Sequence, residues 1–246
     1  MSNPKKYFLD LGTHFGDGLM KHIRHYNIDE SWEVHTFEAN PNTYKEFENV
    51  RNQTPNPSEY FKWIKWDNVH YHNKAVWINN DQIEFYCCSA ENSKPLLETS
   101  DYFKGFMSDL ERKVETGEHI CLYHNFERPT DGASSIVPPE YMDRSQVNEV
   151  QKTFIWKPED KVIVDCFDLS SWILENVKDG DHLLIKMDIE GVEFEVLKKC
   201  LNEGAARRIS EINIEWHDWF LPHKSLEKQQ ITQYLQFVGV KVGGWV

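Results

Sequence analysis

Short apolar segments alternate with amphipathic ones along most of this chain, and this alternation constrains the fold more than any other feature. Segments with the length and character of strands occupy residues 7–11, 33–37, 161–167, 183–187 and 209–216, and 183–187 is a largely apolar run. Segments with helical spacing follow them at residues 17–26, 41–52, 168–177, 189–201 and 225–237. Regular strand–helix alternation predicts an α/β fold: a doubly wound, mainly parallel sheet with helices on both faces.

The middle of the chain departs from this pattern. Residues 69–78 and 82–88 are predicted to be two strands joined by the Asn79-Asn80-Asp81 turn. The polar, proline-bearing stretch 89–158 then lacks sustained periodicity and is expected to carry one helix near 102–115. Long irregular connections are commonly functional, so we interpret 89–158 as an insertion or lid that forms part of an acceptor pocket. The chain as a whole, 1–246, is predicted to be a single domain.

Charge and hydropathy exclude several classes of partner. A net charge of −13 disfavours nucleic-acid binding, because an acidic surface repels phosphate backbones. No apolar run approaches the ~20 residues that span a bilayer, and the polar N-terminus predicts no signal peptide, so we expect a cytoplasmic protein without a membrane span. Five irregularly spaced cysteines without a C-x-x-C pair predict neither a disulfide framework nor a zinc site, and the sequence indicates no oligomeric state.

Polar residues recur where the predicted strands end. Asp10 and Glu38 lie at the ends of the first two strands, Asp188 follows 183–187, and Glu215 and His217 close 209–216. Ligands of doubly wound sheets bind outside the carboxyl ends of the strands. These five side chains are therefore candidates for one binding site.

A glycine-bearing turn connects the first strand to its helix. It reads Asp10-Leu11-Gly12-Thr13-His14-Phe15-Gly16-Asp17, so its glycines allow a tight turn and close approach of the backbone to a ligand. The turn is not G-x-G-x-x-G, which disfavours a nicotinamide-dependent oxidoreductase. Glu38, at the end of the next strand, is placed to accept both hydroxyls of a ribose. Together the two features indicate a nucleoside ligand that needs no phosphate.

Three segments resemble a known family. Residues 8–17 resemble the first motif of class I methyltransferases, which have a Rossmann-like fold, and Thr36-Phe37-Glu38-Ala39-Asn40-Pro41 resembles their ribose-binding segment. The run from Ile185 through Lys186, Asp188, Glu190 and Gly191 to Leu197 is similar to the hallmark of FkbM-type methyltransferases. The resemblance covers about 7–88 and 162–242, and outside them at most Ala133-Ser134-Ser135.

The resemblance implies S-adenosylmethionine as cofactor and assigns roles to particular positions. The turn residues Asp10, Gly12, Thr13, His14, Phe15, Gly16 and Asp17 would surround its methionine and ribose portions. Glu38, with Ala39, would hold the ribose hydroxyls. Asn73, Lys74 and Ala75 would lie near the adenine, and Asp188 would face the methionine amine or the acceptor. His14 stands where many class I methyltransferases have glycine, and only 31 residues follow Glu215, a short length for the family's terminal strand hairpin.

These observations favour an O-methyltransferase acting on a hydroxyl of a sugar or glycan. The alternatives are N-methylation of a small metabolite or peptide, and a non-catalytic protein that binds S-adenosylmethionine. A hydroxyl acceptor needs a base, for which Asp188, His217, Glu215 and His14 are candidates. Glu190 is interpreted as a carboxylate at a helix start that interacts with the helix dipole. Asp188, Glu215 and His217 are residue types that suit a divalent ion, but the pattern does not fix their geometry, and we predict no metal site.

Overall fold

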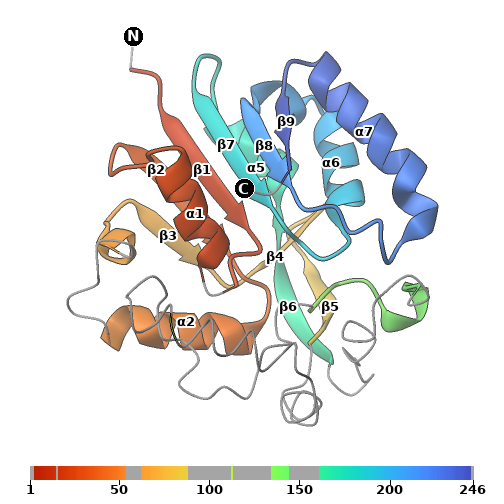
Figure 1. Cartoon of the computed structure of the whole chain (residues 1–246), viewed down its shortest axis with the longest axis horizontal. Helices are drawn as coiled ribbons and strands as arrows, with labels where there is room; N and C mark the ends of the chain where they lie inside the picture. The colour runs from red at the N-terminus through yellow and green to blue at the C-terminus, as the bar shows by residue number, and fades with distance from the viewer. Residues whose placement is uncertain are drawn as a thin grey trace.

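A computed structural model of the chain describes residues 3–14, 16–53, 62–87, 112, 134–143 and 161–244. Within them, six strands form one sheet in which every pairing is parallel (Figure 1). Its order is β3 (Val69–His72), β2 (Trp32–Phe37), β1 (Lys6–Leu11), β7 (His182–Met187), β8 (Glu211–Ile214) and β9 (Lys241–Gly243). The strand order reverses beside β1, so the doubly wound parallel sheet predicted from the sequence is confirmed.

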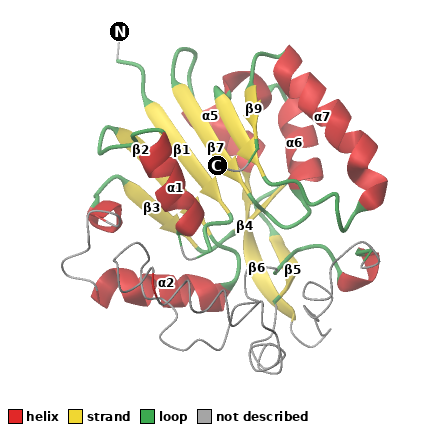
Figure 2. Cartoon of the chain, in the orientation of Figure 1, coloured by secondary structure: helices red, strands yellow, loops and turns green. Residues whose placement is uncertain are grey.

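Helices cover both faces of this sheet (Figure 2). The helices are α1 (Asp17–His25), α2 (Pro41–Gln53), α5 (Leu169–Asn176), α6 (Glu193–Asn202) and α7 (Ser225–Phe237). Successive side chains of a strand point to opposite faces. Leu9 of β1 accordingly packs in a core with α5, α6 and α7, whereas Phe8 packs in a second core with α1 and Phe47 of α2.

A second, three-stranded sheet corrects one sequence-based expectation. Residues 69–78 form two strands in different sheets, β3 and the short β4 (Ala75–Trp77). β4 and β5 (Gln82–Tyr86) do not pair, because β6 (Lys161–Asp168) lies between them, parallel to β4 and antiparallel to β5. The turn at 79–81 is tied to β6, since Cys166 N donates to the Asp81 carbonyl oxygen at 2.7 Å. A strand from distant sequence thus replaced the expected hairpin.

Helix boundaries follow the local chemistry. α5 begins where predicted, with the Asp168 carboxylate accepting a bond from Ser171 N at 3.2 Å as an N-cap. α6 begins at Glu193, so Glu190 lies before the helix and its expected place in the first helical turn is wrong. The shorter 3-10 turns are η1 (Lys62–Lys65), η3 (Pro139–Tyr141), η7 (Ala205–Arg208) and η8 (Pro222–Lys224).

The remaining expectations concern the insertion and the C-terminus. The helix expected near 102–115 lies outside the described residues except for Arg112, and of the stretch 89–158 the structure otherwise describes 134–143. After α7, the chain adds the single parallel edge strand β9 in place of a terminal hairpin within the described residues. Among the residues that the structure describes, no helix has the length and apolar character needed to cross a bilayer.

Candidate active site

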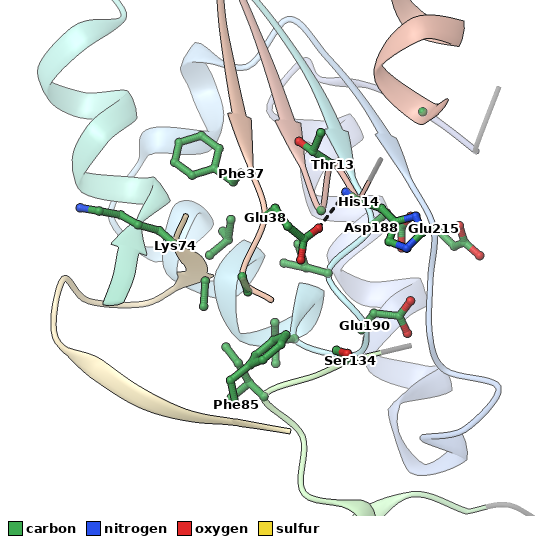
Figure 3. Close-up of a pocket in the computed structure, with 18 of the residues that line it drawn as sticks. Thr13, His14, Phe37, Glu38, Lys74, Phe85, Ser134, Asp188, Glu190 and Glu215 are labelled. Carbon is green, nitrogen blue, oxygen red and sulfur yellow. Dashed lines mark hydrogen bonds between the residues drawn. The ribbon is translucent and has the colours of Figure 1, made fainter. Parts of the chain in front are cut away.

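A cavity of about 270 Å³ opens at the carboxyl ends of β1, β2, β7 and β8 (Figure 3). Nine residues selected from the sequence line it: Gly12, Thr13, His14, Glu38, Ala39, Lys74, Ala75, Asp188 and Glu215. Ser134 and Ile136 of the 89–158 insertion also line it, so the described part of the insertion closes one side of the cavity. The cavity is where the strand order reverses, the usual ligand position in such sheets.

Packing requires glycine at position 12 of the first turn, and the backbone conformation favours glycine at both position 12 and position 16. Gly12 has φ +84°, and a β-carbon there would lie 1.8 Å from the backbone oxygen of Asp188. Gly16 has φ +87°, and its β-carbon would lie 3.0 Å from the ring of Trp63. Both positions are left-handed, which glycine tolerates best. The close backbone approach expected at Gly12 therefore occurs, and its partner is the end of β7.

Glu38 is fixed by backbone donors from two neighbouring segments. Its Oε2 accepts a bond from His14 N and its Oε1 one from Asn40 N, both at 2.8 Å. Burial raises the pKa of Glu38 to about 7, although these two backbone hydrogen bonds oppose the shift. Asn73 holds the chain behind Glu38, because its Nδ2 donates to the Glu38 carbonyl oxygen at 2.8 Å. Each carboxylate oxygen retains capacity to accept a further hydrogen bond.

Lys186 is a buried cation that the sequence analysis did not assign to the site. Its Nζ lies 3.3 Å from Asp10 Oδ1 and 3.4 Å from Asp188 Oδ2, and it donates to the Gly12 carbonyl oxygen at 2.5 Å. Burial lowers the pKa of Lys186, but the two aspartates outweigh this effect and raise it. Lys186 thus joins the first turn to Asp188. A lysine in an otherwise apolar strand is the sequence signal that could have identified it, because a buried charge needs a partner of opposite charge.

His217 lies behind the cavity and contacts three carboxylates. Its Nδ1 is 2.8 Å from Glu193 Oε1, and its Nε2 is 3.4 Å from Glu190 Oε2 and 3.8 Å from Asp188 Oδ1. Burial lowers the pKa of His217, but Glu190 and Glu193 outweigh it and raise that pKa to about 10. The His217 side chain is 3% exposed and does not line the cavity, so it contacts the site through Asp188 and Glu190.

Glu190 also lines the cavity, although it was not among the site residues predicted from the sequence. It has φ +54° and precedes Gly191, whose φ is +103°, so two consecutive left-handed residues turn the chain between β7 and α6. Its side chain, 21% exposed, reaches the cavity and His217. Burial raises the pKa of Glu190 to about 8, with His217 opposing the shift and Asp188 adding to it. The Ser135 hydroxyl of the insertion donates to the Glu190 carbonyl oxygen.

Four predicted site residues stand apart from the cavity wall. Asp10, Gly16, Asn73 and His217 lie outside the lining: Asp10 pairs with Lys186, and Asn73 supports the end of β2. Phe15 lies outside the described residues, and Asp17 is the first residue of α1.

Fold and site together define a class of protein. A parallel sheet of this order, with acidic side chains after β2, β7 and β8 facing one cavity, has the architecture of a Rossmann-like methyltransferase. The chain matches the family described as Methyltransferase FkbM domain over residues 10–242, nearly its whole length, and it belongs to that family. No curated protein and no solved structure matches the sequence.

Proposed function

We propose that this protein transfers the methyl group of S-adenosylmethionine to a hydroxyl group of a sugar or glycan. The observation that carries the proposal is the cavity itself, in which the carboxylates of Asp188, Glu190 and Glu215 face the same space as Glu38. The end of the cavity at Glu38 suits a nucleoside, and the end with the other three carboxylates suits a hydroxylated acceptor.

The residues around Glu38 fit the nucleoside part of S-adenosylmethionine. The two Glu38 oxygens, each with one backbone bond already made, have capacity for the two ribose hydroxyls. Ala75, Val76 and Phe85 give an apolar wall of the kind that covers a flat base. Asp188, held by Lys186, would accept from the methionine ammonium. When bound, the cofactor supplies a methyl group already activated by its sulfonium.

The protein's part in the transfer is to position the hydroxyl and remove its proton. As the new O–C bond forms and the S–C bond breaks, we assign the hydroxyl proton to the Glu215 carboxylate. Glu215 lines the cavity, and burial followed by repulsion from Asp188 raises its pKa. A base whose pKa is raised toward neutrality takes up a proton more readily. Asp188 is the alternative base, and His217 would act by holding Asp188 and Glu190 in place.

The acceptor class is inferred from an exposed tryptophan next to His217, the histidine that contacts Asp188 and Glu190. The Trp219 side chain is 40% exposed and packs edge-on to Phe220, with ring centroids 4.7 Å apart. Its ring centroid lies 6.3 Å from that of His217. An exposed aromatic face near carboxylates suits a sugar ring, because the ring stacks while its hydroxyls donate hydrogen bonds to the carboxylates.

The test uses S-adenosylmethionine carrying a ¹³C-methyl group and a panel of sugars, glycans and amines. We expect the label on an oxygen, which NMR distinguishes from a methyl on nitrogen by its carbon shift. Label on nitrogen would establish the alternative N-methyltransferase, since an acidic pocket also attracts an ammonium group. Cofactor binding without label transfer to any acceptor in the panel would favour the non-catalytic alternative.

A further inference from the structure

Three side chains at the cavity floor present metal-ligand atoms to one another. One oxygen each of Asp188 and Glu190 and one ring nitrogen of His217 all lie within 4.8 Å of one another. Nε2 of His217 is 3.4 Å from Glu190 Oε2 and 3.8 Å from Asp188 Oδ1. Ligands bonded at about 2.1 Å to one ion lie roughly 3–3.4 Å apart when adjacent. The spacing is therefore close to that of a coordination shell.

The other side of the histidine ring fixes which nitrogen is available. Glu193 Oε1 already accepts from the backbone N–H groups of Ile189 and Gly191, at 3.3 and 3.2 Å, which identifies it as an acceptor. The His217 Nδ1, 2.8 Å away, must then carry the hydrogen. In the neutral ring the Nε2 lone pair consequently faces two carboxylates. A carboxylate that orients a histidine in this way is the usual outer partner of a metal-bound imidazole.

Negative charge is concentrated around the same point. Asp188, Glu190 and Glu215 line the cavity and Glu193 is buried behind them, whereas Lys186 divides its charge between Asp188 and Asp10. Glu190 is held in this group from a left-handed backbone position, with φ +54°, which is unfavourable for a residue other than glycine. A divalent cation among these oxygens offsets the repulsion that gathers there.

We propose that Asp188, Glu190 and His217 bind a divalent first-row cation such as Mn²⁺, with Glu193 orienting the histidine. The inference departs from the sequence-based expectation of no metal site and replaces Glu215 by Glu190 in the donor set. Since Asp188 and Glu190 line the cavity, an acceptor hydroxyl entering it can complete the coordination of the ion, which lowers the hydroxyl pKa and leaves Glu215 to take the proton. This last role rests on the proposed function, whereas the binding site does not.

The test measures Mn²⁺ binding to the full chain without cofactor or acceptor, by calorimetry and by electron paramagnetic resonance. We expect wild-type protein to bind Mn²⁺, Glu190→Gln and His217→Gln to weaken that binding at least tenfold, and Glu195→Gln to change it less than threefold. Glu195 is the matched control because it lies on α6 and pairs with Lys224 at 2.6 Å, outside the cavity lining. Thermal melting and S-adenosylmethionine binding establish that each variant is folded.

Two results would overturn the proposal. The first is that wild-type protein binds neither Mn²⁺ nor Zn²⁺ at millimolar concentration. The group between His217 and the carboxylates is then a proton and not a metal ion. The second is loss of binding in Glu215→Gln with retention in Glu190→Gln, which identifies a different donor set. Should the variants not fold, pulsed resonance of Mn²⁺-loaded wild type decides the matter, because nitrogen coupling is expected and its absence excludes His217 as a ligand. Cofactor affinity, measured separately, tells a failure of this site from a failure of the proposed function.

Discussion

Replacing Glu38 with alanine removes the only side-chain carboxylate proposed to bind the ribose. Both of its oxygens are held by backbone N–H groups at 2.8 Å, so they are preorganised as acceptors. Hydrogen bonds to a charged group contribute about 1.5–3 kcal/mol, and about 1.4 kcal/mol is a factor of ten in affinity. We therefore expect Glu38→Ala to weaken S-adenosylmethionine binding by about 10- to 150-fold. The upper end applies if the released N–H groups of His14 and Asn40 also lose their arrangement.

Isothermal titration calorimetry measures this effect, and repeating it at several pH values gives a second, independent test of the assignment. The pKa of Glu38 is raised to about 7, so the carboxylate is ionised above that pH and protonated below it. Ribose hydroxyls favour the ionised form, hence the dissociation constant should rise about tenfold between pH 8 and pH 6. In Glu38→Ala this contribution to the pH dependence should vanish.

Glu33→Ala is the matched control, because it changes a glutamate at the opposite end of β2. Its side chain is 37% exposed and pairs with Lys5 at 3.6 Å. We expect its cofactor affinity to stay within twofold of the wild type. The ribose assignment is refuted if a folded Glu38→Ala protein binds S-adenosylmethionine as tightly as wild type at pH 8.

Three further predictions concern the rest of the site. Gly12→Ala should lower the free energy of unfolding, measured in urea titrations, by at least about 3 kcal/mol. Gly180→Ala is the control and should lower it by only about 1 kcal/mol, because Gly180 has φ +95° but nothing lies within 4 Å of the added carbon; equal losses would show that contact with Asp188 is not the cause. Lys186→Met should cost about 3–5 kcal/mol by the same measurement, because it leaves buried carboxylates without their counter-ion, and a neutral result would show that they fold protonated. Glu215→Gln should lower the single-turnover rate by a factor of roughly 10²–10⁴, and a rate near that of wild type would transfer the role of base to Asp188. His217→Ala should lower the single-turnover rate more than it lowers the affinity for the cofactor.

The sequence predicted the parallel sheet well because each buried strand has its own local signal. Residues 7–11 and 183–187 are largely apolar segments of strand length followed by helical spacing, and such signals do not depend on distant residues. The ends of the predicted strands then locate Glu38 and Asp188 without further information. The second sheet carried no comparable signal, since β4 pairs with β6, about ninety residues later in the chain. A turn such as 79–81 therefore indicated a hairpin that the fold does not contain.

Glu190 shows why the acceptor side of the site was harder to predict. Helical spacing starts at Ile189 in the sequence, yet the backbone at Glu190 and Gly191 is left-handed and the helix begins only at Glu193. A glutamate three residues before the first residue of the helix is compatible with an interaction with its dipole, and nothing local indicates that it turns toward His217. That contact depends on β8 lying beside β7, which is a property of the assembled sheet.

Asp188 connects the two halves of the site. Its Oδ2 lies 3.4 Å from the Lys186 ammonium, which also holds the Gly12 carbonyl oxygen on the cofactor side, while its Oδ1 lies 3.8 Å from His217. The backbone oxygen of the same residue prevents any side chain at position 12. A displacement of Asp188 therefore changes the first turn and the acidic acceptor end together. This coupling gives a physical reason for a lysine and an aspartate two residues apart at the end of a buried strand, since the lysine fixes the aspartate whose two oxygens face different partners.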